Sequence, residues 1–180
     1  MSGDRFHEFS NLVLPSEALG DKMNAFAEVE SRQGEDSIER LALRVGPLGL
    51  LFPVRMGSEV LAPPNTSRLA YLPAWVLGLA NVRGTLVPVV DLAEAIGLSR
   101  DVSARQYTLM VGNRNESMGL LVDGLPVTCK FERKEMLSAL PPHPDMLAGH
   151  ITGALDRNGE VWLDVNAKRL LSALGAQIPT

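Results

Sequence analysis

The stretch LANVRGTLVPVVDLAEAIG, from Leu79 to Gly97, decides the fold that we expect for this chain. Two apolar runs of strand length, Leu77 to Val82 and Leu86 to Val90, are separated by Arg83 and Gly84. Glycine adopts a positive φ without strain, so the Arg-Gly pair predicts a tight hairpin with Arg83 at its tip or edge. A solvated turn arginine and an arginine that binds a partner both fit this position.

Short apolar strands separated by turns continue along the chain, which indicates a small β-barrel or β-sandwich architecture. We expect further hairpins around Gly46 to Gly49, around residues 112–117, and at Asn158-Gly159, the strongest hairpin signal in the sequence. Matching features recur roughly 70 residues apart, such as Gly-Leu-Leu at Gly49 and again at Gly119. This repeat predicts two similar β-lobes, each too small to bury its own face and therefore packed on the other.

The first 37 residues have a different pattern from the rest. Residues 15–31 are expected to be helical, because Leu19, Met23 and Phe26 recur at helical spacing. That helix could pack on the body or dock a partner. We therefore expect an N-terminal helical extension and linker over residues 1–37 and a main domain over residues 38–176, with lobes at about 38–100 and 105–176.

Composition excludes several classes of protein. The net charge of −4 and the lack of a basic cluster argue against nucleic-acid binding, and no run of about 18 apolar residues predicts insertion into a membrane. A single cysteine, Cys129, and the lack of a secretory signal favour a cytoplasmic location. The three histidines, His7, His143 and His150, are dispersed, so we expect no metal and no cofactor.

The remaining catalytic alternative is a hydrolase that would use two aspartates at strand ends. Asp91 and Asp164 could act as the acid and base of a hydrolase. Their repeated position, at the end of an apolar strand and before a helix, instead favours capping of backbone N–H groups. Because no nucleophile or phosphate loop accompanies them, we expect no catalytic residues. A β-lobe protein that binds a small molecule between its lobes stays open as a second alternative.

Three segments resemble the CheW-like domain family of bacterial chemosensory coupling proteins. LPAWVLGLANVRGTLVPVVDLAEAIGL (residues 72–98) resembles the family's signature region, with Asn-apolar-Arg-Gly followed by an apolar strand and Asp-Leu. MGLLVDGL (residues 118–125) resembles its second-lobe strand, and HITGALDRNGEVWLDVNAKRLL (residues 150–171) its closing hairpin and helix. The resemblance covers about Glu39 to Gly175, in order and with compatible spacing.

The resemblance implies a mainly β fold of two intertwined five-stranded, SH3-like β-barrels with short helices. It also implies a non-catalytic adaptor that joins the cytoplasmic tip of a methyl-accepting chemoreceptor to the regulatory domain of a CheA-like histidine kinase. Such a protein is cytoplasmic and is recruited to membrane-associated receptor arrays. The segment WVLGLANVRG is particularly similar to coupling proteins of type IV pilus, or twitching motility, clusters.

The resemblance also suggests which residues bind the receptor. Arg83 is carried over as a receptor contact within Asn81-Val82-Arg83-Gly84, so that Asn81 and Gly84 belong to the same candidate site. Glu59 and the groove residue Val54 are further receptor-binding candidates.

Overall fold

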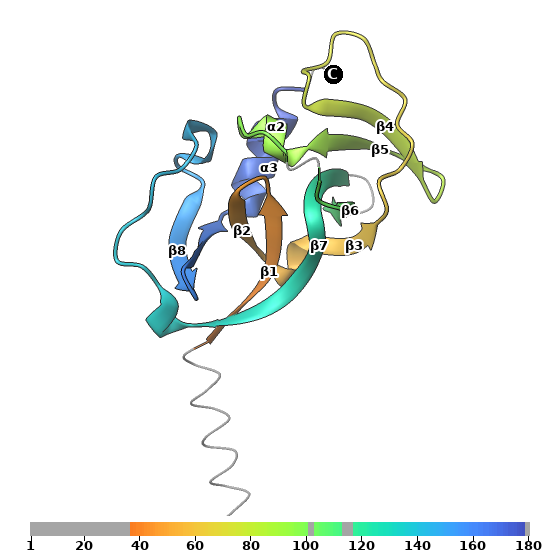
Figure 1. Cartoon of the computed structure of the whole chain (residues 1–180). Coiled ribbons are helices and arrows are strands. Elements are labelled where there is room, and N and C mark those ends of the chain that lie inside the picture. The colour runs from red at the N-terminus through yellow and green to blue at the C-terminus, as the bar shows by residue number, and fades with distance from the viewer. Residues whose placement is uncertain (1–36, 101–102, 113–116, 179–180) are drawn as a thin grey trace, which may run out of the picture. The chain divides into compact units, whose positions relative to one another are not determined.

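The computed structural model describes residues 37–100, 103–112 and 117–178. The described residues from Ile38 onward belong to one compact unit, which is drawn in Figure 1. The predicted N-terminal extension, including the helix expected over residues 15–31, lies outside the described residues apart from Ser37. The extension therefore stays a prediction.

Nine strands and five short helical pieces make up the described residues. The strands are β1 Ser37–Val45, β2 Leu48–Pro53, β3 Gly57–Leu61, β4 Val76–Val82, β5 Thr85–Asp91, β6 Gln106–Val111, β7 Met118–Glu132, β8 Ile151–Arg157 and β9 Glu160–Val165. The helical pieces are η1 Val54–Met56, α2 Leu92–Ala95, η2 Arg133–Glu135, η3 Asp145–Leu147 and α3 Ala167–Gly175. The predicted mainly β fold with short helices is confirmed.

The strands form one continuous sheet in the order β3-β6-β7-β1-β2-β9-β8, and β5 branches from β7 and carries β4 on its other side. Among the described residues this order ends at β3 and β8 and does not close on itself. The SH3-like description of the two barrels therefore stays a prediction. Three expected hairpins are present, β1–β2, β6–β7 and β8–β9, each antiparallel.

The predicted repeat appears in two parallel strand pairings. In β2 and β9, Gly49 pairs with Trp162, and in β5 and β7, Gly119 pairs with Val89. The second pairing matches the first residue by residue. Strands that precede residue 100 thus pair with strands that follow residue 105, so the two halves of the chain interlock (Figure 1). The exact bounds of the two lobes stay a prediction.

The core lies where these two parallel pairings meet the short helices. Leu50 and Leu163 face each other in one pairing and Val90 and Leu120 in the other, and all four side chains are at most 1% exposed. Fully burying a side chain of this size contributes about 1.5–3 kcal/mol. The helices add Leu92 and Ile96 from the α2 region and Leu170 and Leu174 from α3 to the same cluster. Interlocking therefore supplies the core that a single small lobe lacks.

The stretch from Leu79 to Gly97 contains the second half of β4, a two-residue turn, β5 and α2. Pro88 lies in β5 opposite Leu79 of β4. The parallel pairing of β5 with β7 begins one residue later, at Val89. Proline, which has no backbone N–H, is thus placed just outside the parallel ladder.

Candidate functional site

The site is built on the turn between β4 and β5. Arg83 and Gly84 take φ values of 53° and 84°, so both turn residues are in the left-handed region. The Oδ1 atom of Asn81 accepts a hydrogen bond from the backbone N–H of Gly84 at 2.8 Å and closes the turn. Positive φ at both central residues is typical of the two-residue turn that matches the twist of a hairpin. Arginine is an unusual choice for the first of these positions, where Asn, Asp or Gly is preferred.

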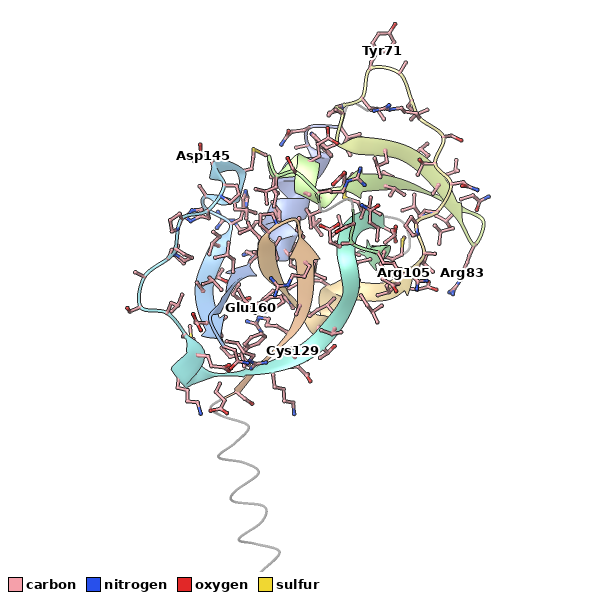
Figure 2. All side chains as sticks on the ribbon, in the orientation of Figure 1. Tyr71, Arg83, Arg105, Cys129, Asp145 and Glu160 are labelled. Carbon is pink, nitrogen blue, oxygen red and sulfur yellow. The ribbon has the colours of Figure 1, made fainter. Side chains whose placement is uncertain are left out.

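The turn holds the Arg83 side chain out in solvent. Its side chain is 78% exposed, and Figure 2 shows it at the end of the β4–β5 hairpin. One terminal nitrogen, Nη2, donates to Oε1 of Glu59 at 2.5 Å. Glu59 lies in β3 and is 29% exposed, so it is the better-anchored member of the pair. The guanidinium is therefore oriented by the fold, while most of its five N–H donors stay available.

Four of the five predicted site residues lie together. Asn81, Arg83 and Gly84 share the turn, and Glu59 reaches it from β3. Val54 stands apart, because it is half-buried in η1 and belongs to none of the strand pairings of the described residues. The receptor-binding role of all five residues stays a prediction.

Sequence reasoning missed an apolar neighbour of this turn. Leu86 pairs with Asn81 across the β4–β5 hairpin and is 67% exposed. The sequence did carry a signal for the exposure of Leu86. Side chains alternate between the two faces of a strand, and since Val87 and Val89 are buried, Leu86 can face solvent. The turn thus offers a cation and an exposed aliphatic side chain on neighbouring positions.

The two aspartates behave differently from each other. Asp91 is 1% exposed and caps α2, since its Oδ1 accepts from the backbone N–H of Glu94 at 3.2 Å. Its Oδ2 lies 2.7 Å from Nε of Arg100. Capping by Asp91 is confirmed.

Capping by Asp164 is wrong. Strand β9 continues to Val165, so the residue that precedes α3 is Asn166, whose Oδ1 accepts from the backbone N–H of Arg169 at 3.1 Å. Asp164 instead accepts two hydrogen bonds from Arg40, at 2.8 and 3.1 Å. Both aspartates are therefore bound to arginines, and this arrangement gives no support to the hydrolase alternative.

Two further features bear on ligands and membranes. No group of three or more His, Cys, Asp or Glu side chains in the described ranges could hold a metal ion. None of the helices in the same part of the chain is long and apolar enough to cross a bilayer.

Comparison with known proteins places the chain in a family. The CheW-like domain family matches residues 40–175. Among curated proteins, protein PilI of Pseudomonas aeruginosa is 31% identical over 124 residues, which cover 68% of this chain and 69% of that protein. A Rhizobium etli protein named "Probable chemotaxis protein CheW" is 30% identical over 88 residues, which cover 48% of this chain and 57% of that protein.

A solved structure has the same fold. The scaffolding protein TtCheW of Thermoanaerobacter tengcongensis superposes with a TM-score of 0.58 at 14% sequence identity. The superposition covers 71% of this chain and 87% of that one. At this identity the likeness concerns the fold alone.

Proposed function

The chain belongs to the CheW-like domain family, as a scaffold or coupling protein of chemosensory systems, and from this membership we propose that it joins a chemoreceptor to a histidine kinase. The proposed partners are the cytoplasmic tip of a methyl-accepting chemoreceptor and the regulatory domain of a CheA-like kinase. The protein itself carries out no catalysis in this proposal. It changes kinase activity by altering how its two partners are held together.

The observation that carries the proposal is the exposed Arg83 on its constrained turn. A mobile surface arginine loses side-chain entropy when it binds, whereas Glu59 already restrains Arg83. Leu86 beside it supplies apolar contact area, and the cation supplies orientation toward an acidic or amide group of the receptor. The Asn81–Gly84 hydrogen bond fixes the turn that presents both side chains.

For the kinase we propose an exposed strand edge as the docking surface. Among the described strands, β3, β4 and β8 each pair with one named strand only. The edges of β4 and β8 carry an additional isolated bridge each, Ser67–Leu79 and Met136–Leu155. Within these residues β3 is thus the edge strand without an additional backbone bridge, and an open edge is suited to adding a strand from another chain.

The pathway and the location follow from the same resemblance. The similarity to PilI and the segment WVLGLANVRG favour a type IV pilus, or twitching motility, cluster over a flagellar one. We propose that the protein is cytoplasmic and is recruited to membrane-associated arrays by its receptor.

The test is co-sedimentation with a receptor signalling domain and the kinase. Arg83→Glu should weaken receptor binding by at least about tenfold, because it removes the donors and adds a like charge against an acidic partner. Its melting temperature should hardly change, since exposed ion pairs contribute about 0–1 kcal/mol. Arg133→Glu, the same charge change at an exposed arginine of η2, is the matched control.

Three results would count against the proposal. Wild-type affinity in Arg83→Glu removes Arg83 from the receptor site. Equal loss in both variants reduces the effect to net charge. Failure of the wild-type chain to bind receptor and kinase, together with a thermal shift caused by a metabolite, would favour the small-molecule alternative.

A further inference from the structure

A groove runs along α3 on a part of the molecule that the coupling role does not use. Its volume is about 460 Å³, and it is largely open to solvent, because Lys168, Arg169 and Ser172 are exposed. The described residues that line it are His150, Lys168, Arg169, Ser172, Ala173 and Ala176. A lysine, an arginine, a histidine and a serine thus line the hollow together with two alanines.

The two strongest charges in this groove are not neutralised. Neither Lys168 nor Arg169 forms an ion pair with an acidic side chain of the described residues. None of the described lining residues is Asp or Glu. The described lining of the groove therefore contains cationic and no anionic side chains, in a chain whose net charge is −4.

Helix stability does not explain these two cations. Helix α3 begins at Ala167, so Lys168 and Arg169 are in its first turn, which contains no acidic residue. The helix dipole makes this end partially positive, and cations are unfavourable there by about 0.3–1 kcal/mol each. An anion bound in the groove would offset the repulsion between the two side chains and the helix end.

His150 adds a further donor. Its backbone is fixed, because its N–H donates to Leu147 at 2.9 Å and its carbonyl accepts from Asn166 at 2.7 Å. The ring Nδ1 is enclosed and has no hydrogen-bond partner among the described residues.

We propose that this groove binds the phosphate group of a small anionic molecule, a nucleotide or another phosphate ester. Lys168 and Arg169 provide the charge, and Ser172 and the ring of His150 provide hydrogen bonds to the remaining oxygens. The groove is made of α3 and the start of β8, whereas the receptor site is the β4–β5 turn. The inference therefore does not depend on the proposed coupling function.

The experiment is a titration of the isotope-labelled full chain, followed by NMR at constant ionic strength. The probes are inorganic phosphate, ATP and, as a carboxylate of similar charge, citrate. We expect saturable shifts at the amides of residues 150, 168, 169 and 172 with phosphate or ATP. Tighter binding of ATP than of phosphate assigns the groove to phosphate esters, and equal binding assigns it to free phosphate.

A pair of matched variants separates the site from general charge. Lys168→Gln with Arg169→Gln should weaken binding at least about tenfold, roughly the loss of one charge-assisted hydrogen bond. Lys130→Gln with Arg133→Gln removes two exposed cations elsewhere and should leave binding unchanged. Shifts that never saturate, equal weakening in both double variants, or tighter binding of citrate than of either phosphate compound would overturn the proposal.

Discussion

The β4–β5 and β8–β9 hairpins are two versions of one local structure. Arg83-Gly84 and Asn158-Gly159 all have positive φ, between 53° and 84°. Each turn is closed by a side-chain oxygen three residues before its final glycine, from Asn81 at 2.8 Å and from Asp156 at 3.0 Å. An arginine near each turn also pairs with a glutamate that precedes the hairpin in the chain.

The two arginines differ in what surrounds them. Arg83 is 78% exposed, and one of its nitrogens contacts Glu59. Arg157 is 32% exposed and donates to both oxygens of Glu135, at 2.7 and 2.9 Å. It also donates to the carbonyl of Lys130, and its guanidinium lies 3.9 Å from the ring centroid of Phe131.

Arg157 is therefore a structural arginine, whereas the guanidinium of Arg83 is accessible from solvent. Arg157 fastens the end of β7 and η2 to the β8–β9 hairpin, with nearly all of its binding capacity used inside the chain. Arg83 has the same kind of turn beside it and the same kind of acidic partner, yet most of its donors face solvent. The two hairpins thus share one turn geometry, while the arginine beside one turn is bound within the fold and the arginine in the other is exposed to solvent.

The largest expected effect is on Arg157. Arg157→Ala removes two bonds to Glu135, the bond to the Lys130 carbonyl and the stacking on Phe131, so it should lower the free energy of unfolding by about 2 kcal/mol. Arg83→Ala should lower it by less than about 0.5 kcal/mol. Urea unfolding of both variants measures the two values. Equal losses of unfolding free energy in the two variants would show that Arg157 contributes no more to stability than Arg83 does.

The same contrast predicts a dependence on pH. The hydrogen bond from Arg157 is the main reason why the pKa of Glu135 falls from 4.5 to about 2. Because the pKa is lower in the folded state, the pair stabilises the fold fully above pH 4.5, and this contribution disappears as the pH falls from 4.5 toward 2. The stability of the wild-type chain should therefore decrease more steeply in this range than that of Glu135→Gln.

Glu39→Gln is the control for the pH experiment, since Glu39 is an exposed carboxylate of β1. Urea midpoints measured at several pH values between 2 and 6 give the slopes. The interpretation fails if Glu135→Gln retains the full wild-type slope while Glu39→Gln loses part of it.

Local sequence was sufficient for the turns. Gly84 and Asn158-Gly159 could be recognised because a two-residue turn depends on the φ preferences of its own residues. The repeat of Gly-Leu-Leu at Gly49 and Gly119 could be recognised without knowledge of strand pairing, and both glycines lie in matching parallel pairings, while the two lobes stay a prediction.

Long-range pairing explains what the sequence could not provide. The Glu59–Arg83 contact spans 24 residues and depends on where β3 lies in the sheet. Asp164 was assigned to a cap because the end of β9 could not be located. It is paired with Arg40, 124 residues away, by the β1–β2–β9 arrangement. Strand ends and ion pairs of this kind are determined by tertiary packing.

The next smaller effect concerns the glycines of the two turns. Gly84→Ala and Gly159→Ala should each cost about 1 kcal/mol, because an L side chain is strained at φ of 84° and 81°. An added Cβ meets no atom within 4 Å at either position, so the two costs should be nearly equal. Gly175→Ala, in α3, should not destabilise the chain. Thermal unfolding of the three variants checks this, and unequal costs would mean that the turns do not share one backbone requirement.

The smallest effect tests why an arginine occupies the first position of the β4–β5 turn. Asn tolerates left-handed φ better than Ala, so Arg83→Asn should be about 0.5 kcal/mol more stable than Arg83→Ala, since both lose the Glu59 pair. The wild-type turn at Asn158 already has this advantage, and Asn158→Ala should lose the same amount. Urea unfolding of Arg83→Asn, Arg83→Ala and Asn158→Ala, each compared with the wild-type chain, measures these free-energy differences. A stable Arg83→Asn chain that no longer binds receptor would mean that Arg83 is retained for recognition despite its backbone strain, whereas an unstable one would assign the residue to the fold.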